Sequence, residues 1–280
     1  MNLKFILSLG FAVVMVPSFA VTTVLANSPS LPGDSFTNSL SSNTGQAIGA
    51  SGWYYNNVRN NGIVGINNNY ARNGLGSMYL ETTQGPGGLS SKADAELWRS
   101  PTQNGNGNYG LGNTSQSLGA LANLSALSYD WYRDSISANS AVQHPSLRLF
   151  IGNQSNTQFG YIIFERVYNG GTVLTDQWVS DDIFANRTSY NMWSTGSLPN
   201  SNDFNVKLSD WMSSSQNYQV YAVSSGVGSG WGTFRGAVDN VGVGFSGANS
   251  VYNFEPVPEP ATMTAMAMGA LALLRKRRKA

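Results

Sequence analysis

The stretch Leu127-Ser128-Tyr129-Asp130-Trp131-Tyr132-Arg133 decides the fold, because apolar and polar side chains alternate along it. Successive side chains of an extended chain point to opposite faces, so Leu127, Tyr129 and Trp131 share one face. The polar residues between them share the other face with Tyr132. The pattern predicts a strand with one face in a core and one face toward water.

The same alternation recurs farther along the chain, over residues 146–151 and 240–245. Between the two ends of the chain, no segment of ten or more residues has a helical period, so any helices are expected to be single turns. We therefore predict strands at residues 77–82, 95–99, 124–133, 146–151, 159–168, 173–179, 218–223 and 236–245. About eight strands separated by Gly- and Asn-rich turns predict an all-β protein with a single antiparallel β-sandwich.

Charge and cysteine content argue against a nucleic-acid partner and against disulfide bonds. Of the 280 residues, Lys4 and five terminal cations belong to the two ends, and residues 27–257 hold ten Lys/Arg against fourteen Asp/Glu, a net charge of −4. Nucleic-acid binding needs clustered Lys and Arg, so this composition argues against a nucleic-acid partner. The chain has no cysteine, so no disulfide stabilises the fold.

The C-terminal end has three parts in fixed order: Val257-Pro258-Glu259-Pro260, the uncharged run 261–274, and Arg275-Lys276-Arg277-Arg278-Lys279. The prolines cannot continue a helix, so the first part is expected to be extended and accessible. A helix over the second part spans roughly 21 Å, against about 30 Å of bilayer hydrocarbon. The cations at the end hold the basic tail on the cytoplasmic side of the membrane, which places the residues before Pro258 outside.

These parts resemble the PEP-CTERM sorting signal of Gram-negative bacteria, which a membrane protease-transpeptidase, the exosortase, reads and removes. The resemblance implies exosortase as a processing partner, transient insertion into the inner membrane, and a final place on the cell surface or in the extracellular matrix. It assigns the sorting motif to Val257, Pro258, Glu259, Pro260, Arg275, Lys276, Arg277 and Arg278. The alternative is a simple C-terminal anchor that is never cut.

The N-terminal end predicts a secretory signal peptide: a basic start up to Lys4, an apolar run over residues 5–16, and small residues beyond it. Two cleavage sites fit, after Ala20 and after Ala26, and the later site leaves a polar start at Asn27. The predicted plan is a signal peptide at 1–26, a β-sandwich at 27–255 and a sorting signal at 256–280.

Two further stretches resemble jelly-roll carbohydrate-binding modules of galactose-binding-like or concanavalin-like fold: Gly52-Trp53 with the following residues 70–80, and the closing stretch 237–243. In those modules the acid on the closing strand contributes to a structural calcium site. The resemblance implies Ca²⁺ at Asp239, with Asp34 beside it if the ends of the domain pair. The alternative is that Asp239 only hydrogen-bonds the backbone of a loop.

Aromatic residues in polar surroundings are candidates for sugar binding, because an aromatic ring packs on the C–H face of a sugar while amide and charged groups bind its hydroxyls. Most rings are expected in the core. The glycan-binding candidates are those among Gly and Asn: Trp53, Tyr54, Trp193 and Trp231.

Catalytic patterns are weak. His144, the single histidine, precedes a proline, and no Gly-x-Ser-x-Gly elbow occurs. Paired carboxylates such as Asp130 with Asp134, or Glu165 with a cross-strand acid, leave glycoside hydrolysis open as a minor alternative. We expect no enzyme and no catalytic residues, and two classes remain. One is an exported surface or matrix protein that binds or organises exopolysaccharide in biofilm or floc; the other is a structural or adhesive protein without glycan binding.

Overall fold

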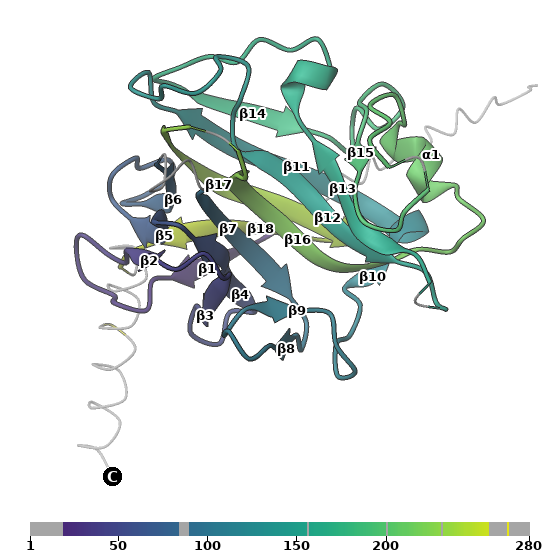
Figure 1. Ribbon diagram of the computed structural model, residues 1–280, viewed down its shortest axis with the longest axis horizontal. Helices are drawn as coiled ribbons and strands as arrows, with labels where there is room; N and C mark the ends of the chain where they lie inside the picture. Colours follow the sequence, from purple (N-terminus) through teal and green to yellow (C-terminus); the bar gives the residue numbers. More distant parts are fainter. Residues whose placement is uncertain are drawn as a thin grey trace, which may run out of the picture.

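A computed structural model describes residues 19–83, 90–155, 157–199, 201–230, 232–257 and 268. Its two large sheets lie face to face, as Figure 1 shows, and confirm the predicted all-β sandwich. The helices in the described ranges are short, namely α1 (Leu208–Met212) and the 3-10 turns η2 (Leu121–Asn123) and η3 (Arg166–Tyr168).

Sheet A has the order β1-β18-β17-β6-β5-β2, with β11 on the other edge of β17 and β14 beyond it. Its strands are β1 (Phe19–Leu25), β2 (Phe36–Asn38), β5 (Gly62–Asn67), β6 (Ser77–Thr82), β11 (Leu124–Arg133), β14 (Trp178–Asp182), β17 (Phe234–Phe245) and β18 (Ala248–Glu255). All its pairs are antiparallel except β1 with β18, which is parallel.

Sheet B has the order β15-β13-β12-β16-β7-β4-β3, and β10 also pairs with β16. Its strands are β3 (Thr44–Ala47), β4 (Trp53–Arg59), β7 (Lys92–Trp98), β10 (Gly119–Ala120), β12 (Ser146–Gly152), β13 (Phe159–Phe164), β15 (Trp193–Ser194) and β16 (Gln219–Gly228). A small hairpin of β8 (Thr102–Gln103) and β9 (Tyr109–Gly110) lies apart from both sheets in the hydrogen-bonding pattern.

The core lies between the sheets and follows the predicted alternation. Leu127, Tyr129 and Trp131 of β11 are buried, and Leu147 and Leu149 of β12 are fully buried opposite them. Each fully buried side chain of this size stabilises the fold by roughly 1.5–3 kcal/mol. The other face of β11, predicted to lie toward water, is partly covered: Asp130 is 8% exposed, and Tyr132 is half-buried with its ring stacked on Tyr70.

Several strand bounds differ from the prediction. Strand β13 ends at Phe164 and not at 168, because the backbone N–H of Arg166 turns away to donate to His144 Nε2. The predicted strand 173–179 is shifted to β14 (178–182). Strands β5 and β18 were not predicted, since Asn and Gly interrupt their apolar pattern.

The described residues extend past the predicted domain limits of 27 and 255. Strand β1 lies within the predicted signal peptide, and Pro256 is buried beside Gly33 and Gly76. The predicted helix over 261–274, apart from residue 268, and the sorting residues from Pro258 onward lie outside the described residues. In the part of the chain that is described, no helix is long and apolar enough to span a bilayer.

Candidate functional site

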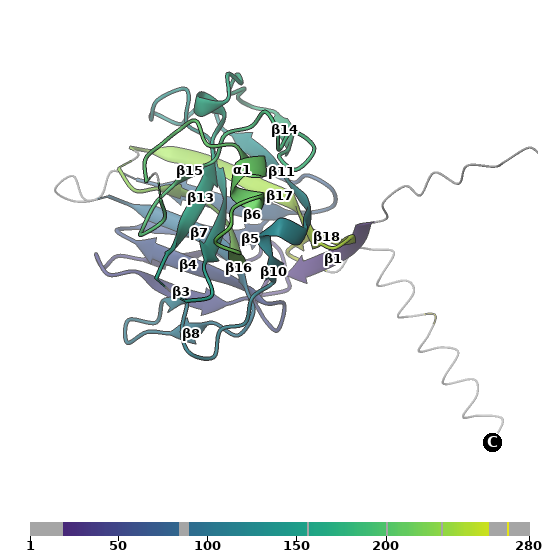
Figure 2. The same cartoon turned by 90° about the vertical axis from the view of Figure 1, so that its right-hand side faces the viewer.

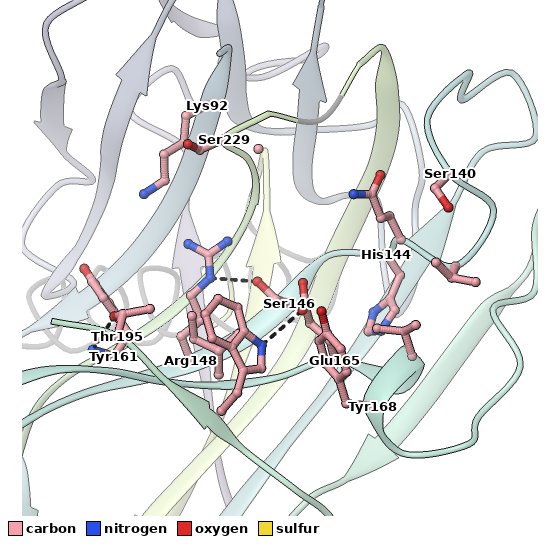
Figure 3. Close-up of a pocket in the computed structure, with 16 residues that line it drawn as sticks. Lys92, Ser140, His144, Ser146, Arg148, Tyr161, Glu165, Tyr168, Thr195 and Ser229 are labelled. Atoms are coloured by element: carbon pink, nitrogen blue, oxygen red, sulfur yellow. Dashed lines mark hydrogen bonds between the residues drawn. The ribbon is translucent and has the colours of Figure 1, made fainter. Parts of the chain in front are cut away.

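The outer face of sheet B, which points away from the core, carries a hollow of about 560 Å³ over β12, β13 and β15 (Figure 3). We call it the sheet-B hollow. Its floor comes from the strands, and its rim comes from the loop before β12 and the end of β16. Its lining includes Lys92, His144, Ser146, Arg148, Tyr161, Glu165, Tyr168 and Trp193.

Strand register places the floor residues in one row across the sheet. Ile163 lies opposite Trp193 on one side and Arg148 on the other. The row continues through Ser224 and Glu96 to Tyr54. Trp193 and Tyr54 therefore lie on the same face of sheet B, five strand spacings or roughly 24 Å apart.

One buried carboxylate, Asp94, holds both cations of the hollow in place. Asp94, which is fully buried, accepts from Arg148 Nη1 at 3.0 Å and from Lys92 Nζ at 2.9 Å. Arg148 Nε donates to Ser146 Oγ at 2.7 Å, so the guanidinium is fixed on two sides. Buried cations need such partners, because an unpaired charge away from water is costly.

Glu96 beneath the hollow has four hydrogen-bond donors. Its Oε1 accepts from Tyr161 Oη at 2.8 Å and from Asn57 Nδ2 at 3.0 Å. Its Oε2 accepts from Trp98 Nε1 at 2.7 Å and from Asn56 Nδ2. With every lone pair used, this carboxylate positions the Tyr161 ring and has no free oxygen for a ligand.

Trp193 is fixed at the edge of the hollow. Its indole Nε1 donates to Glu165 Oε2 at 3.1 Å, and Phe204 and Tyr168 pack beside the ring. Burial raises the pKa of Glu165, although the nearby Arg148 and the Trp193 hydrogen bond lower it. The Trp193 side chain remains half-buried, so part of the ring faces solvent.

The structure separates the four predicted glycan-binding residues. Trp53 is 1% exposed and makes edge contacts with Tyr252 and Phe254, so the prediction of a sugar platform at Trp53 is wrong. Tyr54 is half-buried, and Tyr109 covers its ring at a centroid distance of 4.3 Å. Trp193 borders the hollow, and Trp231 lies outside the described residues.

Sequence reasoning missed Lys92, Asp94, Glu96 and Arg148 as members of one site. A signal was present in Lys92-Ala93-Asp94-Ala95-Glu96-Leu97, where charged and apolar residues alternate. In a strand this pattern places three charged side chains on one face and small apolar ones on the core face. Charges at alternate positions of a strand with an apolar core face indicate a polar site on a sheet.

The two predicted calcium ligands have different surroundings. The Asp34 carboxylate accepts from the backbone N–H groups of Asn27 and Ser28 and from Tyr55 Oη. Asp239 is fully buried and accepts from the backbone N–H of Phe254 at 3.0 Å, the contact expected in the alternative without calcium. Its Oδ2 has no hydrogen-bond partner in the described structure.

The Asp239 Oδ2 atom, which has no hydrogen-bond donor, fits a ligand of a cation. The Asp34 carboxylate instead accepts hydrogen bonds from Asn27 and Ser28 in the connection between β1 and β2. Among the described residues, no three His, Cys, Asp or Glu side chains gather around a metal position. Calcium at Asp239 therefore needs amide and carbonyl oxygens for most of its shell.

If calcium binds at Asp239, a chelator is expected to lower the melting temperature. The loss in stability at a hundredfold excess of calcium over Kd is about 2.7 kcal/mol. Scanning calorimetry with and without chelator measures it, and Asp239→Asn is expected to remove the chelator effect. Identical melting curves of the unaltered protein under both conditions rule the site out.

Comparisons with known proteins identify one segment of the chain. Residues 256–279 match the PEP-CTERM protein-sorting motif, which confirms the resemblance and implies export with C-terminal membrane anchoring or processing. No curated protein matches the chain.

Among solved structures, one neighbour is described as "Structural basis for the promiscuous specificity of the carbohydrate-binding modules from the beta-sandwich super family". It is 10% identical, with a TM-score of 0.32, and the match covers 80% of this chain. The match spans 62% of the neighbour's own length. At this level the likeness carries no argument about function.

Proposed function

We propose that the β-sandwich is the exported, non-catalytic domain of a surface or matrix protein, and that its sheet-B hollow binds a neutral glycan. The observation that carries this proposal is Trp193, a half-buried ring fixed by Glu165 at the edge of a hollow whose lining includes the donors Arg148 and Lys92. An aromatic ring beside fixed polar groups suits a ligand with one apolar C–H face and several hydroxyls.

The charge balance of the site favours a neutral ligand. The cations Arg148 and Lys92 are both paired with Asp94, and Glu96 lies beneath them. An anionic ligand would have to compete with these buried carboxylates for the same cations. Neutral sugar hydroxyls can instead accept from the N–H groups that Arg148 and Lys92 do not donate to Asp94 and Ser146, without displacing either partner.

The lining supports binding over hydrolysis. Cleavage of a glycosidic bond uses two carboxyl groups about 5 to 10 Å apart. Among the described residues that line the hollow, Glu165 is the acidic one, and it already accepts from Trp193. Asp94 and Glu96 of β7 already accept hydrogen bonds, Asp94 from Arg148 and Lys92 and Glu96 from four donors.

A shallow site of this kind supports weak affinity, with a Kd of about 1 mM to 1 μM, or −4 to −8 kcal/mol. Many copies facing a repeating polymer raise the effective concentration, so weak sites can still organise an exopolysaccharide matrix. Exosortase, acting on the sorting motif, is the processing partner in this proposal, and biofilm or floc is the setting.

A polysaccharide array is expected to retain the purified domain, and Trp193→Ala is expected to weaken retention at least about tenfold, or 1.4 kcal/mol. The matched control is Trp178→Ala, since Trp178 is also half-buried but lies on sheet A. Both variants should melt near the unaltered protein. Equal loss in both variants contradicts the site, and a folded domain that no glycan retains favours the purely structural or adhesive alternative.

A further inference from the structure

We infer that the mature protein begins at Val21, because signal peptidase cuts after Ala20 and leaves strand β1 in the domain. Strand β1 pairs with β18 in parallel over seven residues, from Phe19 opposite Asn249 to Leu25 opposite Glu255. Figure 2 shows the two strands side by side at the edge of sheet A. The inference rests on the predicted signal peptide and is independent of the glycan proposal.

Burial along β1 distinguishes the two candidate cleavage sites. Val24 is 0% exposed and Ala26 is 5% exposed, and both belong to the hydrophobic core. Phe19 is 42% exposed, and Ala20 is also exposed. A cut after Ala20 therefore removes only surface residues of the strand, whereas a cut after Ala26 removes a buried valine and alanine.

The composition of the segment fits a strand of the folded domain. Residues 21–24 read Val-Thr-Thr-Val, four β-branched residues in succession. Such residues are enriched in strands, where their branched side chains pack well. Small residues stand at the first and third positions before a cut after Ala20, namely Ala20 and Ser18, as signal peptidase requires.

Strand β1 also protects the segment that leads into the sorting motif. The backbone N–H of Ala26 donates to the carbonyl of Glu255 at 3.0 Å, one residue before Pro256. Without β1, the outer edge of β18 presents a row of unpaired backbone groups, which is a site for edge-to-edge aggregation. A mature chain that starts at Asn27 lacks this protection where the sorting segment leaves the domain.

The test is N-terminal sequencing and intact-mass measurement of the full chain exported by a Gram-negative host. The expected N-terminus is Val21. A protein that starts at Asn27, at Met1 or at any other residue overturns the inference. The same mass also reports whether the basic C-terminal tail has been removed.

A full-chain variant separates a cut after Ala20 from later trimming. Ala20→Arg places a long charged side chain at the cleavage position, where a small residue is needed. Because Ala20 is exposed, the substitution leaves the core unchanged. The species that starts at Val21 is expected to disappear from this variant, and its persistence shows that another protease creates that terminus.

Discussion

Replacing Asp94 by Asn is expected to lower the free energy of unfolding by about 3 to 5 kcal/mol. The Asp94 side chain is fully buried and pairs with both Arg148 and Lys92, whose side chains are 8% and 17% exposed. The amide keeps the shape of the residue but removes its charge, so two largely buried cations lose their partner. Leaving a buried charge unpaired is among the costliest single changes in a protein.

Denaturant unfolding monitored by tryptophan fluorescence measures this change. The matched control is Arg72→Ala, which removes the ion pair between Arg72 and Asp130 on sheet A. The Arg72 side chain is 34% exposed, and Asp130 keeps Ser180 Oγ and Asn240 Nδ2 as donors, so the loss of Arg72 is expected to cost only about 1 kcal/mol. A similar small effect for Asp94→Asn would mean that water reaches Arg148 and Lys92 freely, contrary to the buried arrangement.

The sandwich could be predicted from β11 and β12 because large apolar residues alternate there with polar ones. Strand β4 shows why other strands could not be predicted from the sequence pattern. Its residues Asn56 and Asn57 are buried, with amides that donate to Glu96 across the sheet. A polar side chain is read from the sequence as exposed to solvent unless its hydrogen-bond partner is known. Here the partner, Glu96, lies about 40 residues away in the sequence.

The site could be predicted only in part for the same reason. The two-residue period of a strand gives the face of each side chain, but it does not give the neighbouring strand. Trp193 was found because Gly and Asn surround it, whereas its partner Glu165 lies 28 residues earlier. Trp53 has equally polar neighbours in the sequence, yet Tyr252 and Phe254 of β18 cover it.

Acidification from pH 7 to pH 4 is expected to destabilise the domain through His144, which is 1% exposed at the rim of the hollow. The backbone N–H of Arg166 donates to its Nε2 at 2.9 Å, so the ring proton sits on Nδ1, 2.8 Å from the carbonyl of Pro145. A second proton on Nε2 would face that N–H donor. Burial lowers the pKa of His144 to about 4, and although Asp181 and the Pro145 hydrogen bond raise it, Arg166 and Arg133 lower it further.

The direction of the effect follows from proton uptake in the two states. The unfolded histidine has a pKa of 6.5, so between pH 6.5 and about 4 the unfolded chain binds a proton that the folded domain does not. The stability that His144 contributes is therefore fully present above pH 6.5, falls as the pH falls through this window, and levels off below about pH 4. The difference of about 2.5 between the two pKa values corresponds to roughly 3 kcal/mol.

Unfolding free energies measured at intervals between pH 4 and pH 8 test this prediction against His144→Gln. The glutamine amide oxygen can still accept from the Arg166 N–H but does not titrate, so the variant is expected to show a shallower fall. Carboxyl groups titrate in both proteins, and the difference between the two curves isolates the histidine. Because His144 stacks on Trp131 at a centroid distance of 4.5 Å, the variant starts from lower stability, and only the slopes are compared. Equal slopes would mean that His144 is protonated in the folded domain, with Arg166 N–H bonded elsewhere.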